Sequence, residues 1–307
     1  MSASSFGPLE HAAALRLIQL GLQEDLGERG DLTCQGLIDP QLRATVQVVA
    51  RKPGFLSGMP VGELMYRQMD PAVQWEALAR DGDSLTAGQV VANVTGPVGT
   101  LLTGERTMLN FLTHLSGIAT LTSQFVAAAR GSRTGRTKAK ILDTRKTLPG
   151  YRILAKYAVR CGGGHNHRMG LHDGVLIKDN HLAAWQPTGS IAEAIAHTRR
   201  KLGQTSGAPG SDIDIEVEVD TLEQMVDAFA GSPQIVLLDN MTTAQLAEAV
   251  AYRDTHAPHI LLEASGGVTL ATVAEIAATG VDRISVGAIT HSAPQLDLAF
   301  DWSQALA

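Results

Sequence analysis

The hydrophobic and polar positions of the chain follow one pattern before about residue 136 and another after it. Apolar residues recur at helical spacing from about Ala12 to Asp25 and from about Leu102 to Ala129, which predicts two helices. Between them, Arg43 to Val98 alternates branched with polar residues and is interrupted by glycine-containing turns, as short strands are. We therefore predict a small α/β sandwich over residues 1–115. The pair Ser116-Gly117 indicates a break that splits the second helix in two.

Beyond residue 136, short apolar runs alternate with helical stretches, which predicts a parallel β/α assembly. The predicted strands are Ala139 to Leu142, Val175 to Ile177, Ile213 to Val219, Ile235 to Leu238, Ile260 to Leu262 and Ile284 to Val286. They end in polar residues: Asp143 and Arg145, Lys178, Glu218, Asp239, Glu263 and Ser265, then Ser285 and Gly287. Functional groups at the carboxyl ends of successive strands are typical of a (β/α) barrel. The glycine-rich fingerprint of an open nucleotide-binding sheet is absent from the sequence.

These patterns predict an α/β protein with two domains. The second domain, residues 116–292, is expected to be an incomplete or irregular TIM-like barrel that carries the active site. The C-terminal tail, residues 293–307, is expected to pack back on the N-terminal sandwich.

Composition narrows the class of protein. The two cysteines, Cys34 and Cys161, are too few and too far apart for a disulfide framework or a metal site, so a reducing cytoplasm is the expected location. We expect neither export nor a membrane anchor, because the sequence shows no leader pattern and no apolar run of membrane-spanning length. Sparse aromatic residues in its basic part argue against nucleic-acid binding.

Positive charge is concentrated between Arg133 and Lys178. This segment has eleven Lys or Arg residues and two acids, a net charge of +9, in a chain whose net charge is −6. Such a field concentrates anions, so a polyanionic ligand is the functional interpretation and a solvated basic face is the structural one. Arg152, Lys156 and Arg160 recur four residues apart, which predicts one exposed helix stripe.

Carboxylates alternate with branched residues from Ile213 to Asp220, which places all these acids on one face of the predicted strand. If that face points into a barrel, the acids require compensating cations. Glu218, nearest the mouth, would then join Asp239 in approaching a divalent ion, and hard carboxylate oxygens suit Mg²⁺. The alternative is an edge strand whose acids face solvent.

Two turns near the C-terminus, Glu263 to Gly267 and Ser285 to His291, place small residues and backbone N–H groups after predicted strands. Such turns can bind a phosphate group. Either turn alone is a common structural feature. Together, at the last two strands, they match the usual phosphate position of a barrel.

Seven blocks of the chain closely resemble the quinolinate phosphoribosyltransferase family, in order and over nearly its whole length. They are Gly104 to Asn110, Asp143 to Gly150, Lys156 to Val159, Gly162 to Leu171, Leu176 to His181, Leu238 to Met241, and Leu262 to Gly267 with Thr279 to His291. The early runs Glu24 to Gly27 and Gly30 to Thr33 also match. The departures are Leu148, where Thr is frequent, and a longer loop at Gly203 to Ser211.

The resemblance implies that quinolinate and 5-phosphoribosyl 1-pyrophosphate (PRPP) give nicotinate mononucleotide, pyrophosphate and CO2 with Mg²⁺, in de novo NAD biosynthesis. It implies a homodimer in which Arg106 enters the neighbouring subunit's site. The residues expected to bind quinolinate are Arg106, Arg145, His167, Arg168 and Lys178. Those expected at the reacting centre are Lys146, Lys178, Glu218 and Asp239, the last two also binding the metal. Those expected to bind the PRPP phosphates are Lys146, Ser265, Gly266, Gly287 and His291.

Other interpretations of the same residues stay open at this point. The chain could be a phosphoribosyltransferase paralogue of the same fold that uses another acid, such as nicotinate, or a non-catalytic polyanion-binding protein. His181 is expected to orient the loop after Lys178 rather than to bind substrate. His165 and His172 are not expected to bind a metal, and Cys161 is expected to be a packed thiol.

Overall fold

The structure is a computed structural model, and it describes residues 5–131, 139–185, 189–203 and 213–302. Apart from Gly203, the predicted loop Gly203 to Ser211 lies outside the described residues, as do the last five residues of the predicted tail. The chain divides into two compact units. The first comprises Met1–Ser123, Lys146–Gly164 and Ile289–Ala307, and the second comprises Gln124–Arg145 and His165–Ala288.

The first unit contains a four-stranded sheet in the order β12-β1-β5-β3, with antiparallel pairs throughout. These strands are β1 (Arg43–Ala50), β3 (Gln74–Ala77), β5 (Val90–Pro97) and β12 (Leu298–Trp302). A second, two-stranded sheet pairs β2 (Gly54–Phe55) with β4 (Ser84–Leu85). The helices are α1 (Pro8–Leu26), α2 (Leu32–Leu37), α3 (Met59–Met69), α5 (Arg152–Cys161), α11 (Ala288–His291) and most of α4 (Val98–Arg130).

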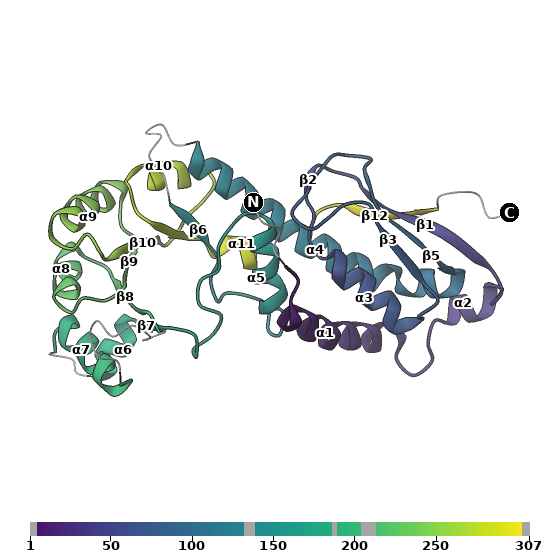
Figure 1. Ribbon diagram of the computed structural model, residues 1–307, viewed down its shortest axis with the longest axis horizontal. Coiled ribbons are helices and arrows are strands. Elements are labelled where there is room, and N and C mark those ends of the chain that lie inside the picture. Colours follow the sequence, from purple (N-terminus) through teal and green to yellow (C-terminus); the bar gives the residue numbers. More distant parts are fainter. Residues whose placement is uncertain (1–4, 132–138, 186–188, 204–212, 303–307) are drawn as a thin grey trace. The chain divides into compact units, whose positions relative to one another are not determined.

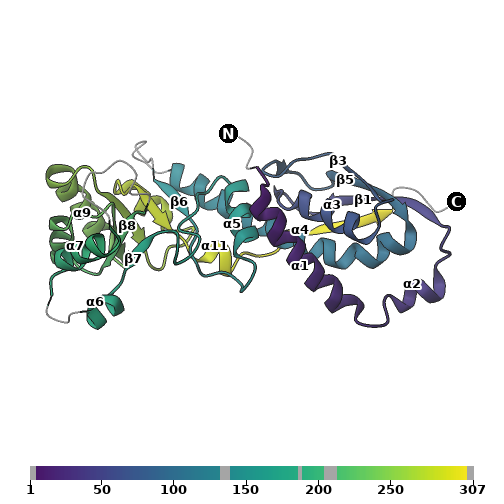
Figure 2. The ribbon, with the colours of Figure 1, turned by 60° about the horizontal axis from the view of Figure 1, so that its bottom comes forward.

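Helix α3 packs on one face of the four-stranded sheet (Figure 2). Its buried Tyr66 lies with its ring centroid 6.2 Å from that of Trp75 on β3 and 6.5 Å from that of Phe300 on β12. The Tyr66 hydroxyl donates to the carbonyl of Leu101 at 2.9 Å, so the polar end of this ring is satisfied inside the core. The predicted sandwich is therefore built, but with a helix where the sequence indicated further strands.

Helix α4 is a single helix of 33 residues, so the predicted break at Ser116-Gly117 is wrong. Gly117 is instead a point of close approach between segments. A Cβ atom there would lie 2.1 Å from the carbonyl oxygen of Pro294. Glycine is needed because the returning C-terminal segment packs directly on the helix backbone at this residue.

Helix α5 corrects the prediction of an exposed basic stripe. Lys156, in the middle of that stripe, has no solvent exposure, while Arg152 and Arg160 are partly buried. Residues 154–159 are all buried, so this helix is enclosed around most of its circumference and has no free face for a cationic row. Arg160 NH2 lies 2.7 Å from Glu10 Oε1 and joins α5 to α1.

The second unit is built on six parallel strands in the order β6-β11-β10-β9-β8-β7 (Figure 1). They are β6 (Lys140–Leu142), β7 (Val175–Ile177), β8 (Ile215–Val219), β9 (Ile235–Asp239), β10 (Leu261–Ser265) and β11 (Arg283–Ser285). The helices are α6 (Asp179–Trp185), α7 (Ile191–Lys201), α8 (Leu222–Ala230), α9 (Thr243–His256) and α10 (Val273–Ala278). Figure 1 shows α7 to α10 along the outer side of the strands.

The strand order is that of a barrel opened at one seam. Strands β7 to β11 are neighbours in chain order, and β6 lies beside β11, so the sequence of strands wraps around and leaves its gap between β6 and β7. An isolated parallel bridge between Leu142 and His165 places the segment after α5 against β6 at this gap. The predicted irregular TIM-like fold is confirmed, and all six predicted strands are present.

None of the helices in the described part of the chain combines the length and the apolar character needed to cross a membrane.

Candidate active site

The carboxyl ends of the six parallel strands meet at one edge of the second unit. Because parallel strands all run the same way, polar residues at their ends gather there. The predicted site residues of this unit are Arg145 after β6, His167 and Arg168 before β7, Lys178 after β7, Glu218 on β8, Asp239 on β9, Ser265 and Gly266 at the end of β10, and Gly287 after β11.

Lys178 and Glu218 form an ion pair across the neighbouring strands β7 and β8. The Lys178 ammonium donates to Glu218 Oε2, and the two side chains are 41% and 16% exposed. The loop after β7 is held by His181, whose Nδ1 accepts the backbone N–H of Lys178 at 3.0 Å. The prediction that His181 orients this loop is confirmed.

Asp239 ends β9 and is joined to the turn that follows. Asn240 adopts a left-handed conformation with φ of 53°, and its side-chain amide donates to Asp239 Oδ2 at 2.7 Å. The backbone N–H of Asn240 donates to the carbonyl of Ser265 at 2.9 Å, which ties the ends of β9 and β10 together. Both Glu218 and Asp239 are only partly buried, so their carboxylates remain accessible at the edge of the strands.

Gly266 is required by this junction. Its φ is 92°, and a Cβ atom would lie 2.2 Å from Asn240 Oδ1. A side chain is therefore excluded by both backbone strain and space. The neighbouring Gly267 also has a positive φ of 58°, but no atom lies within 4 Å of its Cβ position. The backbone at the end of β10 is thus exposed beside Ser265 and Asp239, whereas its use as a phosphate site stays a prediction.

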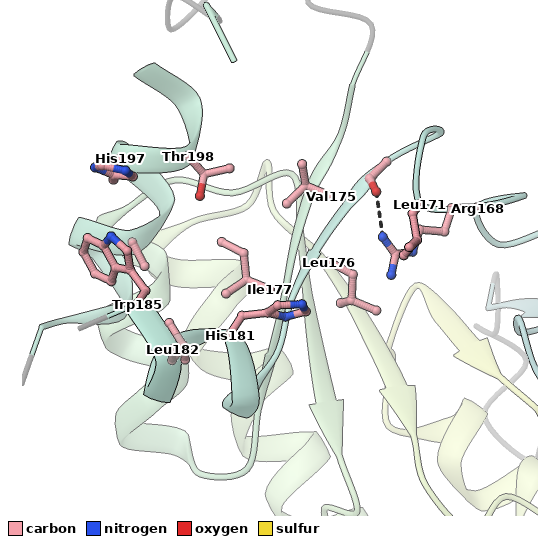
Figure 3. Close-up of a pocket in the computed structure, with 12 residues that line it drawn as sticks. Arg168, Leu171, Val175, Leu176, Ile177, His181, Leu182, Trp185, His197 and Thr198 are labelled. Carbon is pink, nitrogen blue, oxygen red and sulfur yellow. Dashed lines mark hydrogen bonds between the residues drawn. The ribbon is translucent and has the colours of Figure 1, made fainter. Parts of the chain in front are cut away.

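The guanidinium groups of Arg145 and Arg168 are close enough to repel each other electrostatically. Burial lowers the pKa of Arg168, and the positive charge of Arg145 lowers it further, while Glu216 and Asp173 oppose the change. Arg168 NH1 donates to the carbonyl of Gly174 at 2.7 Å, which fixes the direction of the side chain (Figure 3). Adjacent like charges of this kind are tolerated where an anion is bound between them.

His167 is buried, with 8% exposure, in a cluster of charged side chains from three strands. Its Nε2 lies 3.0 Å from Glu216 Oε2 on β8 and 3.4 Å from Glu263 Oε1 on β10. Arg283 on β11 completes the cluster, with its Nε 2.6 Å from Glu263 Oε2. We call these four residues the buried cluster. The prediction that His167 binds quinolinate directly stays a prediction.

Burial and hydrogen bonding shift the pKa of His167 in opposite directions. Burial lowers the pKa of His167, but hydrogen bonds to Glu216 and Glu263 outweigh burial and raise it to about 9. The same ring accepts the N–H of Arg168 through Nδ1 at 2.9 Å, which a doubly protonated ring cannot do. Burial also raises the pKa of Glu216, so His167 and Glu216 share a single proton between them. With Glu263 and Arg283 oppositely charged, the buried cluster is then neutral.

The sequence pointed to only part of this cluster. Alternation along β8 placed its acids on one face, and the structure confirms that Glu216 and Glu218 both meet cations or an imidazole inside the barrel. The alternative of a solvent-facing edge strand is wrong, because β8 lies between β7 and β9 and Glu216 is 3% exposed. Nothing in the local sequence indicated that Glu263 would contact His167, or that Arg283 would pair with Glu263.

Three predicted site residues, Arg106, Lys146 and His291, belong to the first unit. Arg106 is exposed on α4, next to Thr107, whose hydroxyl donates to Asp25 Oδ2 at 3.1 Å. Lys146 has an exposed side chain, and its carbonyl accepts the hydroxyl of Thr290 at 2.8 Å. This bond holds the segment of Lys146 beside the short helix that ends at His291.

A pocket of about 340 Å³ lies beside strand β7 in the second unit (Figure 3). Arg168 stands at one end, and the remaining walls come from the segment before β7 and from β7, α6 and α7. The rings of Trp185 and His197 are tilted by 45° with their centroids 5.4 Å apart. The walls are mainly apolar, as in many small-molecule sites, and neither Glu218 nor Asp239 lines this pocket.

Cys161 is buried in the first unit, and burial together with the nearby Asp81 raises its pKa to about 12. A thiol in that state is a poor nucleophile. The prediction of a packed thiol is confirmed.

Two domains of one protein family together match most of the chain. Residues 31–116 match the N-terminal domain, and residues 118–301 the C-terminal domain, of quinolinate phosphoribosyl transferase. A carboxylating nicotinate-nucleotide pyrophosphorylase of Mycobacterium leprae is 45% identical over 95% of this chain and 98% of its own length. A probable enzyme of the same name from Bacillus subtilis is 39% identical over 95% of this chain and 94% of its own.

Solved structures give the same result. The nicotinate-nucleotide pyrophosphorylase of Francisella tularensis superposes with a TM-score of 0.85 at 35% identity, covering 98% of this chain and 99% of its own. Human nicotinic acid phosphoribosyltransferase shares the fold with a TM-score of 0.60 at 13% identity, covering 92% of this chain and 73% of its own. The chain therefore belongs to the quinolinate phosphoribosyltransferase family.

Proposed function

We propose that the protein transfers the phosphoribosyl group of PRPP to quinolinate and releases pyrophosphate and CO2, giving nicotinate mononucleotide for de novo NAD biosynthesis. One observation carries this proposal: charged side chains of both signs, those of Arg145, Lys178, Glu218 and Asp239, end or follow the parallel strands, and Arg168 interacts electrostatically with Arg145. Arg145, Arg168 and Lys178 supply the positive charge, and Glu218 and Asp239 supply the negative charge.

The cations suit an aromatic acid with two carboxylates. Arg145 and Arg168 provide planar guanidinium groups, and Lys178 adds an ammonium group on the next strand end. Hydrogen bonds between such cations and carboxylates contribute about 1.5–3 kcal/mol each, so two carboxylates need a set of this size. An acid with a single carboxylate would leave part of this positive charge uncompensated.

The carboxylates suit the transfer step. The bond from the ribose C1 to pyrophosphate breaks, the pyridine nitrogen forms a bond to C1, and the leaving group takes the electron pair. Positive charge develops on the ribose, where Glu218 and Asp239 stabilise it, while Lys178 and Lys146 stabilise the departing pyrophosphate. The ion pair with Glu218 places the Lys178 ammonium at the strand ends.

Decarboxylation follows nucleotide formation. The new bond leaves the ring nitrogen positively charged, so the electron pair of the breaking carbon–carboxylate bond is stabilised on the adjacent ring carbon, which then takes up a proton. No side chain has to act as a nucleophile, in agreement with the inert state of Cys161.

Mg²⁺ is the metal that we propose, held by Glu218 and Asp239. The donor set fits, because both residues present partly exposed carboxylate oxygens, which Mg²⁺ prefers, and it is usually bound by one or two carboxylates together with substrate phosphates and water. The ion would neutralise negative charge on the pyrophosphate of PRPP. Ser265, Gly266, Gly287 and His291 are proposed to bind the PRPP 5-phosphate through backbone N–H groups and short polar side chains.

We propose a homodimer in which Arg106 completes the site of the partner chain. Its exposed position on α4 leaves the guanidinium available to another molecule. Inactive Arg106→Ala and inactive Lys178→Ala chains, mixed and allowed to exchange, should recover part of the wild-type activity, because one site in each mixed dimer would then be intact. If activity does not return although mixed dimers form, each site is built from a single chain.

The function itself is tested by a product assay with PRPP and Mg²⁺, comparing quinolinate with nicotinate. Mononucleotide and CO2 are followed separately. We expect equal amounts of both products from quinolinate and neither from nicotinate. Turnover of nicotinate would assign the protein to another acid, and turnover of neither acid would favour a binding protein.

A further inference from the structure

The segment from His165 to Arg168 is neither helix nor strand beyond one isolated bridge at His165, and the backbone N–H groups of His167 and Arg168 both donate to side chains. The buried Asp143 accepts the backbone N–H of His167 at 2.9 Å and the side-chain amide of Asn166 at 2.6 Å. The next backbone N–H, that of Arg168, donates to Nδ1 of the His167 ring at 2.9 Å. The position of the Arg168 backbone therefore depends on the position of an imidazole ring.

The ring is fixed from its other side by the buried cluster. Its Nε2 faces Glu216 Oε2 at 3.0 Å and Glu263 Oε1 at 3.4 Å, so strands β8 and β10 both hold it. Arg283 in turn fixes Glu263 at 2.6 Å. Since rigid strands carry all three partners, the imidazole has little freedom to turn.

Burying the four ionisable side chains of this cluster inside the barrel costs free energy. Apolar residues of similar volume would serve stability equally well, because buried ionic groups lose their hydration. The cost is increased by incomplete pairing, since Glu216 Oε1 has no hydrogen-bond partner among the described residues and Glu263 Oε1 has only the long 3.4 Å approach of His167 Nε2. Stability alone therefore does not account for two carboxylates at this depth.

We propose that Glu216, Glu263 and Arg283 are positioning residues for the acid substrate: they fix the imidazole of His167, which fixes the backbone of Arg168 and thereby the guanidinium. The guanidinium is held at its far end as well, because NH1 donates to the carbonyl of Gly174 at 2.7 Å. The inference rests on the proposed function, in which Arg168 binds a carboxylate of quinolinate.

A metal ion is not needed to explain the same groups. The ligand atoms of His167, Glu216 and Glu263 lie within 4.8 Å of one another, a spacing that would suit a cation. However, Arg283 already balances Glu263, and Nε2 of His167 faces both carboxylates as a hydrogen-bond donor. A divalent ion would have to displace that proton and stand beside a guanidinium.

The test compares Glu216→Leu with Glu216→Gln in the full-length enzyme. Leucine fills similar volume but cannot accept from Nε2, so the KM for quinolinate should rise about tenfold. The kcat and the KM for PRPP should stay within about twofold, because the acids at the strand ends are untouched. Glutamine keeps an acceptor oxygen and should restore most of the affinity. Direct titration of the free enzyme with quinolinate should give the same ranking.

The control is Arg253→Met, which breaks a buried ion pair with Asp282, the residue just before β11, and leaves every contact of the His167 ring in place. Arg253 is 6% exposed, and its NH1 lies 2.5 Å from Asp282 Oδ2. This variant should lower the melting temperature without changing the KM for quinolinate. If Glu216→Leu fails to fold, Glu216→Met asks the same question with a longer apolar side chain that also cannot accept from Nε2, and it should raise that KM as well.

Each outcome separates the two claims. A folded Glu216→Leu enzyme with an unchanged KM for quinolinate overturns the positioning role alone, as does an equal rise in KM for Arg253→Met. A wild-type enzyme that neither binds nor converts quinolinate overturns the proposed function, and the positioning role with it.

Discussion

Glu216 and Glu218 are two residues apart on the same strand and the same face, yet their surroundings differ. Glu216 has a side chain that is 5% exposed and faces His167, which is itself buried. Glu218 has a side chain that is 16% exposed and faces Lys178, which is 41% exposed. Two residues along one barrel strand therefore separate Glu216, which contacts only other protein groups, from Glu218, which is accessible to a substrate.

The difference extends to the neighbouring strands. The deeper row, the buried cluster, is neutral and closed, whereas the outer row of Lys178, Glu218 and Asp239 stands at the strand ends, where water and ligand have access. Depth in the barrel decides whether an ionisable group contributes mainly to stability and geometry or mainly to chemistry.

The largest expected effect is a loss of stability, caused by a substitution in the deeper row. Arg283→Met leaves Glu263 buried without its cation, which should lower the free energy of unfolding by about 3–5 kcal/mol. Lys178→Met, in the outer row, should lower it by about 1 kcal/mol or less, because exposed pairs contribute little. Urea unfolding followed by circular dichroism measures both, and equal losses would contradict the contrast.

The next largest expected effect is a loss of kcat, caused by a substitution in the outer row. Glu218→Gln should lower kcat by about 10²–10³-fold, since it removes a charge that stabilises the transition state. Glu216→Gln should leave kcat within about twofold. Steady-state formation of nicotinate mononucleotide compares the two variants, and a similar loss of kcat in both would show that depth does not separate their roles.

A pH titration sharpens the contrast. The pKa of His167 is raised to about 9 and that of Glu216 is also raised, so the folded state retains a proton that the unfolded chain releases earlier. This stabilisation is fully present below about pH 6.5 and is lost as the pH rises through about 9. The loss is on the order of 3 kcal/mol. Unfolding free energies measured across this range should fall in the wild type and fall less in Glu216→Gln.

The smallest expected effect concerns the turn at Gly266 and Gly267, which follows β10 and lies beside the end of β9. Gly266→Ala should cost about 2 kcal/mol or more, because a left-handed conformation and a clash with Asn240 act together. Gly267→Ala has open space and should cost about 1 kcal/mol. Thermal unfolding compares the two, and similar shifts would mean that the clash is relieved by a movement of the Asn240 side chain.

Elements with a strong local pattern were predictable from the sequence. The six barrel strands are short apolar runs flanked by helical stretches, and the structure has a strand at each of them, with boundaries that differ by up to three residues. Residues at strand ends were predictable as well, because parallel strands all terminate at the same edge.

What the sequence did not reveal depends on partners far along the chain. Helix α3 is capped by Asp81, whose carboxylate accepts the N–H groups of Gly58 and Met59 from more than twenty residues away. A local search for a capping residue misses it. Alternation along β8 showed that Glu216 and Glu218 share a face, with Glu218 nearer the mouth, but only the structure shows that Glu216 meets the buried ring of His167.

Strand β12 has a consequence for the order in which the molecule is made. It pairs with β1, which is encoded about 250 residues earlier, over Val46 to Ala50. A growing chain that has already released β1, β3 and β5 from the ribosome therefore carries an open sheet edge until the whole barrel has been synthesised. Unpaired edges recruit other strands, so chains truncated before residue 298 should aggregate during expression even though most of both units is present.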